Sequence, residues 1–159
     1  MSTSTVQVHR VWIKATPQAV WDAITSPEWN AQYGYGCPSE YDLRPGGTYR
    51  VLANEAMTQH GAPPVIIDGE VLESDPPNKL VQTWRANFSP DLTAEGFTRL
   101  TWEITEEYGA VRLTVTHELE GAPMAAAQVA GDIPGAGGGW TYIISDLKTL
   151  LETGKTFAS

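Results

Sequence analysis

Two neighbouring segments with alternating apolar and polar residues constrain the fold of this chain most strongly. Residues 97–105 place Leu100, Trp102 and Ile104 on one face and polar residues on the other. Residues 111–119 repeat the pattern, and their apolar face consists of Val111, Leu113, Val115, His117 and Leu119. Alternation with a period of two is typical of a strand that is buried on one face and solvated on the other. The four residues 106–109 between the segments predict a hairpin turn, so we expect an antiparallel sheet with one covered face.

A long amphipathic helix is predicted over residues 139–153, because apolar residues recur there at steps of three and four. The apolar positions are Trp140, Ile143, Ile144, Leu147, Leu150 and Leu151, and the opposite polar positions are Thr141, Ser145, Asp146 and Lys148. Gly154 stands where a helix C-cap is expected. One side of this helix should pack against the buried face of the sheet.

The first part of the chain predicts one strand followed by two short helices. Residues 6–13 have the pattern of a strand. Thr16-Pro17 supplies an N-cap and a proline at the first helical position, and Ser26-Pro27 ends that helix, whose Trp21 we assign to the core. A second helical turn is expected around Glu28-Trp29. Turn residues then separate further strands, which are predicted at 40–43, 48–54, 65–73 and 79–86.

These elements predict an α+β fold in which a curved antiparallel sheet of about six or seven strands wraps around a long C-terminal helix. Two short helices follow the first strand. The length of 159 residues fits one domain over residues 1–159, with a core from about residue 6 to residue 153.

Charge and cysteine content argue against several classes of function. Ten Lys and Arg against 19 Asp and Glu give a net charge of -9, which disfavours nucleic acid or an anionic membrane as a partner. Cys37 is the only cysteine, so neither an intrachain disulfide nor a cysteine zinc cluster can form. His9, His60 and His117 are widely spaced, and no nucleophile-elbow motif is present. We expect no metal, no cofactor and, without a signal-peptide pattern, a cytoplasmic location.

Several short motifs, in their order and spacing, resemble one protein superfamily. They are residues 15–24 (ATPQAVWDAI), 42–49 (DLRPGGTY), 69–73 (GEVLE), 75–77 (DPP), 80–84 (LVQTW) and 138–140 (GGW). The chain resembles the START/polyketide-cyclase-like (SRPBCC, helix-grip) superfamily over about residues 6–153. Within it the chain is similar to the bacterial branch named after the activator of the heat-shock chaperone ATPase. This resemblance implies an apolar cavity between the sheet and the long helix, in a superfamily that binds lipophilic molecules, cyclises polyketides, sequesters metabolites or modulates partner proteins.

Aromatic residues are the main candidates for lining such a cavity, since large rings with a few polar tips are usual in small-molecule pockets. The same rings could equally serve as ordinary packing around the helix. The predicted ligand-binding residues are Trp29, Tyr33, Tyr35, Tyr49, Trp84, Phe88, Trp102, His117, Trp140 and Ile144.

Three further features each leave two interpretations open. His117 could donate a proton in the cavity, or it could be a core histidine that is satisfied by hydrogen bonds. Residues 87–96 could form a lid that closes with Phe88 and Leu92, or they could be a mobile end of a hairpin. The glycine-rich residues 131–139 could cradle a phosphate, but a flexible loop leading into the last helix is the favoured interpretation.

The favoured function is the binding of a lipophilic, aromatic or polycyclic small molecule for carriage, sensing or sequestration. This hypothesis requires a pocket of roughly 300 Å³ or more. The alternative is a polyketide cyclase or dehydratase in which His117 and a tyrosine, Tyr49 or Tyr35, steer proton transfer. A third hypothesis is a modulator of a partner protein such as a chaperone. The chain could also form a homodimer.

Overall fold

The structure is a computed structural model that describes residues 5–133 and 138–157, and it is built on one antiparallel sheet. The strands lie in the order β1-β7-β6-β5-β4-β3-β2. Their bounds are β1 (Val6–Ile13), β2 (Ser39–Tyr41), β3 (Thr48–Leu52), β4 (Val65–Asp75), β5 (Lys79–Ala86), β6 (Thr98–Glu107) and β7 (Ala110–Glu118). The helices are α1 (Pro17–Thr25), α2 (Pro27–Asn30), α3 (Glu55–Gln59), α4 (Pro90–Ala94), α5 (Pro123–Ala130) and α6 (Gly139–Thr153).

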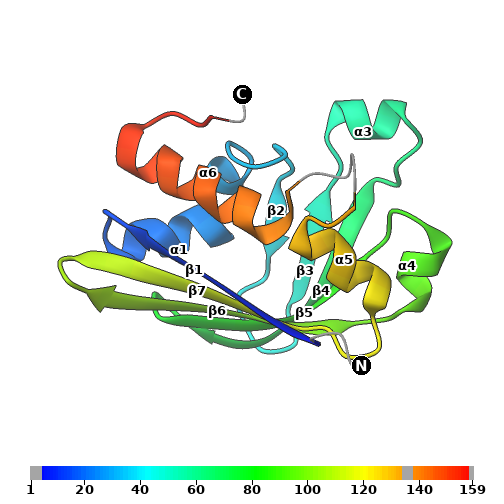
Figure 1. Cartoon of the computed structure of the whole chain (residues 1–159), viewed down its shortest axis with the longest axis horizontal. Coiled ribbons are helices and arrows are strands. Elements are labelled where there is room, and N and C mark those ends of the chain that lie inside the picture. Colours follow the sequence, from blue (N-terminus) through cyan, green and yellow to red (C-terminus); the bar gives the residue numbers. More distant parts are fainter. Residues whose placement is uncertain (1–4, 134–137, 158–159) are drawn as a thin grey trace.

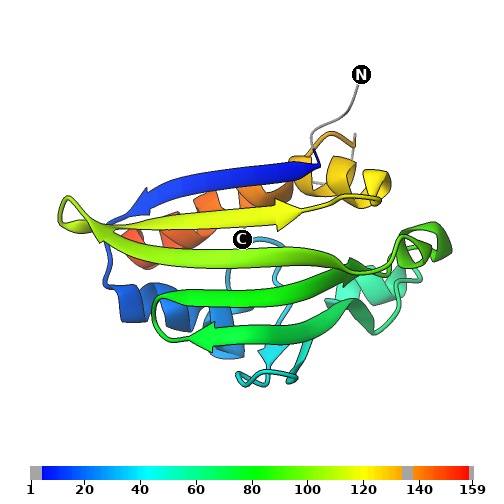
Figure 2. The same cartoon turned by 90° about the horizontal axis from the view of Figure 1, so that it is seen from below.

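The sheet curves, and α1 and α6 lie on the same side of it (Figures 1 and 2). The alternation along β6 and β7 is confirmed, because Leu100, Trp102 and Leu113 are buried whereas Glu103 and Glu118 are exposed. All neighbouring strands are antiparallel. The predicted α+β helix-grip architecture, with two short helices after the first strand, is therefore confirmed.

The long helix α6 has the predicted bounds and ends at Gly154, whose φ of 81° gives the left-handed C-cap. Ile144, Leu147 and Leu150 are buried, as the apolar stripe predicted. The assignment of Asp146 to the solvated face was wrong, because this side chain is 0% exposed. Its carboxylate accepts hydrogen bonds from two backbone N–H groups, Gly34 at 2.9 Å and Phe157 at 2.8 Å, which compensate its burial.

Strand boundaries shift by a few residues where local hydrogen bonds end or extend the ladder. β2 ends at Tyr41 rather than at residue 43, because the backbone turns between Asp42 and Gly47. β4 runs on to Asp75 rather than to residue 73. The hairpin turn after β6 consists of Tyr108 and Gly109 rather than four residues, and both have a positive φ, at 57° and 76°.

Three short helices, α3, α4 and α5, were not predicted. Each follows a local helix-start signal: Asn54 accepts a hydrogen bond from Met57 N, Ser89 accepts one from Leu92 N, and Pro123 occupies the first turn of α5. Asn54 is also the reason why β3 ends at Leu52 rather than at residue 54. The helix α4 lies inside the segment 87–96, which was expected to be a loop. The predicted flexible loop over residues 131–139 lies partly outside the described residues.

Among the described residues, no helix is both long enough and apolar enough to span a membrane.

Candidate functional site

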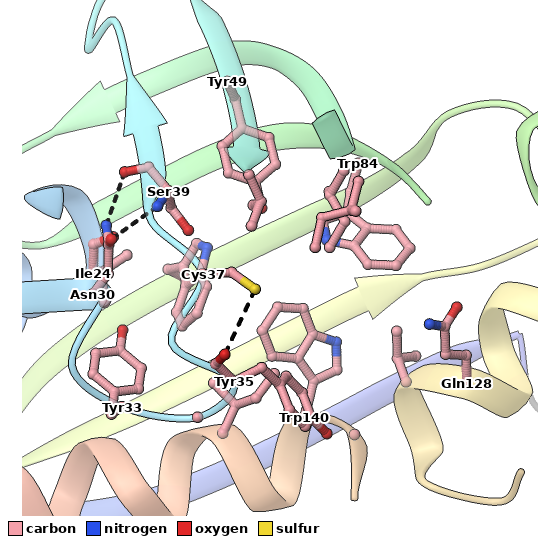
Figure 3. A pocket seen from close by; sticks show the side chains of 18 of the residues that line it. Ile24, Asn30, Tyr33, Tyr35, Cys37, Ser39, Tyr49, Trp84, Gln128 and Trp140 are labelled. Carbon is pink, nitrogen blue, oxygen red and sulfur yellow. Dashed lines mark hydrogen bonds between the residues drawn. The ribbon is translucent and has the colours of Figure 1, made fainter. Parts of the chain in front are cut away.

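A mostly apolar pocket of about 140 Å³ lies between the inner face of the sheet and the helices α5 and α6 (Figure 3). Seven of the predicted ligand-binding residues line it: Tyr33, Tyr35, Tyr49, Trp84, Phe88, Trp102 and Trp140. Tyr49 and Trp84 come from β3 and β5, and Trp140 comes from the first turn of α6. Strands and a helix that are distant in the sequence therefore each contribute an aromatic side chain to the wall of the pocket.

Three predicted residues lie outside the pocket. Trp29 is 41% exposed, because the single turn α2 directs Asn30 inward instead. The Asn30 side chain donates to Ile24 O and Ser39 O and accepts from Ser39 N, which fixes that turn. Ile144 is buried in the core cluster. His117 is fully buried in contact with Trp84 and Trp140, two residues of the pocket wall.

Both ring nitrogens of His117 are hydrogen bonded. Nδ1 accepts from the indole N–H of Trp140 at 3.1 Å, and Nε2 lies 2.7 Å from Thr98 Oγ1. The Thr98 hydroxyl donates its proton to Trp84 O at 2.9 Å, so His117 Nε2 must be the donor to Thr98. Burial lowers the pKa of His117 to about 3, with a smaller contribution from His9. The imidazole is neutral near pH 7, and it fixes the orientation of Trp140.

A second polar group sits among the aromatic residues of the inner sheet face. Gln82 Oε1 accepts from Tyr41 Oη at 2.7 Å and from Trp102 Nε1 at 3.2 Å. The rings of Tyr41 and Tyr49 are 4.7 Å apart. Burial raises the pKa values of both phenols above their usual range, so both stay protonated near neutral pH. Alternation along residues 80–84 places Gln82 on the same face as Trp84, but Gln82 was not among the predicted site residues because its side chain is polar.

The described residues that line the pocket include no Asp, Glu, Lys, Arg or His. Two of their polar atoms, Trp84 Nε1 and Gln128 Oε1, are buried without a hydrogen-bond partner. The same residues include Cys37, whose Sγ lies 3.6 Å from Met57 Sδ and whose pKa is raised by burial. Cys37, Met57 and Gln128 were not predicted as pocket residues, because none of them belongs to a periodic pattern. Within the described part of the chain, no three His, Cys, Asp or Glu side chains are arranged to hold a metal ion.

Phe88 and Met57 separate the pocket from a second, open groove beside α3. Phe88 belongs to the segment 87–96, which was considered as a lid. This segment is attached to α5, because the Glu95 carboxylate accepts hydrogen bonds from Met124 N at 2.8 Å and Ala125 N at 2.9 Å. Whether the segment moves as a lid stays a prediction.

A family described as "Activator of Hsp90 ATPase homolog 1-like protein" matches residues 14–152. Among solved structures, CalU16 from Micromonospora echinospora has a TM-score of 0.66 and 18% identity over 94% of this chain and 77% of that chain. DynU16, a protein in the dynemicin biosynthetic locus, has a TM-score of 0.67 and 22% identity over 97% of this chain and 49% of that chain. The Aha1 dimer from Colwellia psychrerythraea has a TM-score of 0.63 and 18% identity over 96% and 99% of the two chains. A search of curated proteins found no match.

Proposed function

We propose a ligand-binding function for this chain, which belongs to the family of Activator of Hsp90 ATPase homolog 1-like proteins. The ligand is an uncharged aromatic small molecule of about one ring, held between the sheet and α6. Carriage, sensing and sequestration would all use such a site.

The observation that carries this proposal is a pocket left unfilled among aromatic side chains. A cavity of roughly 150 Å³ lined by apolar groups stays dry and takes benzene, and the present pocket is about 140 Å³. The pocket does not reach the roughly 300 Å³ that the hypothesis from the sequence required, so that hypothesis fails for a polycyclic ligand and the proposal is limited to a smaller one. No charged side chain lines the pocket in the described part of the chain, which favours an uncharged molecule because burying an unpaired charge is very unfavourable.

The cyclase alternative depends on a proton-transferring group in the same pocket. His117 is poorly suited to transfer a proton to a ligand. Both of its ring nitrogens are hydrogen bonded, its pKa is low, and it lies behind the residues that line the pocket. Tyr35 and Tyr49 do line the pocket, but burial raises the pKa of Tyr49, which disfavours its phenolate. Modulation of a chaperone and formation of a homodimer stay predictions. One of the similar structures is described as a dimer.

The proposal predicts that acetophenone, or a similar one-ring compound, stabilises the protein and shields Cys37. At ten times its Kd, a ligand adds about 1.4 kcal/mol, which corresponds to a rise in Tm of roughly 3–6 °C for a domain of this size. Since Cys37 lines the pocket and is the only cysteine, the same ligand should slow the reaction of its thiol with an aromatic disulfide reagent. The two measurements are thermal unfolding and the rate of thiol labelling.

Two variants with the same change of side chain separate pocket binding from surface binding. Val129→Phe places a larger side chain in the pocket and should abolish both effects. Val8→Phe makes the same change at an exposed position on β1 and should leave both effects intact. Equal stabilisation of the two variants, or labelling of Cys37 that is insensitive to every one-ring compound, would contradict the proposal.

A further inference from the structure

We propose that the ligand carries a neutral acceptor oxygen, such as a ketone oxygen, which accepts a hydrogen bond from the indole N–H of Trp84. This inference rests on the proposed function and specifies the chemistry of the same pocket. The proposed ligand class is therefore an uncharged aromatic carbonyl compound.

The three indoles that line the pocket are unequally paired. The Trp102 N–H donates to Gln82, and the Trp140 N–H donates to His117. Among the described residues, the Trp84 N–H has no hydrogen-bond partner, although Trp84 is only 3% exposed. A buried N–H group without an acceptor is unfavourable and uncommon in native proteins, so it needs an explanation.

Trp84 is held in place by its neighbours. Its ring contacts His117 edge to face at a centroid distance of 4.9 Å, and its backbone oxygen accepts from Thr98. The nearby Tyr49 hydroxyl does not satisfy its N–H. The Tyr49 hydroxyl lies near enough to the Trp84 N–H to oppose the rise in the Tyr49 pKa that burial causes, but the two groups are not aligned as a hydrogen bond. In Figure 3, Tyr49 and Trp84 both project from the sheet towards the pocket.

Buried polar atoms without a partner are concentrated at the pocket in the described part of the chain. Only four buried side-chain polar atoms there have no partner, and two of the four, Trp84 Nε1 and Gln128 Oε1, belong to residues that line this pocket. The indole can act only as a donor, so its partner must be an acceptor. A carboxylate would lose its hydration with no cation among the lining residues to replace it, which leaves a neutral oxygen.

The test compares two compounds of matched shape, acetophenone and α-methylstyrene, in which a carbonyl oxygen is replaced by a methylene group. Calorimetry on the wild-type protein should give acetophenone an affinity about five- to tenfold higher, as expected for one hydrogen bond. Trp84→Phe removes the donor and should therefore bring the two affinities to the same value. Trp12→Phe is the matched control and should keep the preference, because Trp12 lies outside the pocket and its N–H already donates to Glu107.

Each outcome separates this inference from the proposed function. Equal affinities in the wild-type protein would overturn the acceptor inference and leave the binding function standing. A preference that persists in Trp84→Phe, or benzoate binding more tightly than acetophenone, would also overturn the inference. If neither compound binds, both proposals fail. A measurement by NMR on the wild-type protein does not depend on the folding of a variant. The indole N–H resonance of Trp84 should shift downfield when acetophenone binds but not when α-methylstyrene binds.

Discussion

Replacing Asp146 by alanine should lower the free energy of unfolding by about 3 kcal/mol, because two backbone donors lose a charged acceptor. The carboxylate connects three parts of the chain, since it lies on α6 and accepts from Gly34 N and Phe157 N. Gly34 lies between Tyr33 and Tyr35, and all three residues line the pocket. Urea denaturation followed by circular dichroism measures the change.

Two further variants show whether the effect comes from these hydrogen bonds. Asp146→Asn keeps the size of the side chain and one acceptor oxygen, so it should lose about half as much stability as Asp146→Ala. Glu103→Gln removes a charge at an exposed position on β6 and should change the stability by less than about 0.5 kcal/mol. If Asp146→Ala is as stable as Glu103→Gln, the buried carboxylate does not hold these segments together.

The stability of the protein should fall by about 2 kcal/mol between pH 7 and pH 5, mainly because of His117. Burial lowers the pKa of His117 from 6.5 to about 3 in the folded state. As the pH falls below 6.5, the unfolded chain binds a proton at this histidine and the folded chain does not. The free energy of unfolding therefore decreases as the pH falls, over the window from 6.5 to about 3.

Substitutions of His117 and His9 show which histidine causes this pH dependence. His117→Gln should remove most of the slope between pH 7 and pH 5, whichever way its stability at pH 7 changes. Burial also lowers the pKa of His9, which is only half-buried and acts in the same direction, so His9→Gln should remove a smaller part. A wild-type stability that is constant over this range, or an imidazole NMR signal of His117 that titrates near pH 6.5, would contradict the assignment.

The sequence predicted the sheet and the long helix because both rest on periodic burial that covers many residues. It did not predict the short helices, although Ser89-Pro90 carries the same start signal as Thr16-Pro17. A helix of five residues has no apolar stripe, so the cap alone marks it. Asp146 was misplaced for a different reason. Its polar side chain fits a solvated face by type, and the donors that allow its burial lie at Gly34 and Phe157, outside the helix.

The candidate site was predicted by residue type more than by position. Trp102 lies on the inner face of the sheet, as the alternation along residues 97–105 predicted, because alternation fixes the face of a strand. Trp29 was misplaced, since one helical turn gives no periodicity from which its direction could be inferred. The volume of the pocket depends on how side chains from different elements interdigitate, and no local pattern contains that information.

Locating a bound ligand would show whether an uncharged aromatic molecule occupies the pocket. Isotope-filtered NMR on the complex with acetophenone should give NOEs from the ligand ring to Trp84, Trp140 and Ile143, which line the pocket from both sides. NOEs confined to exposed residues such as Val8 and Trp12 would place the ligand on the outer surface and contradict binding in the pocket.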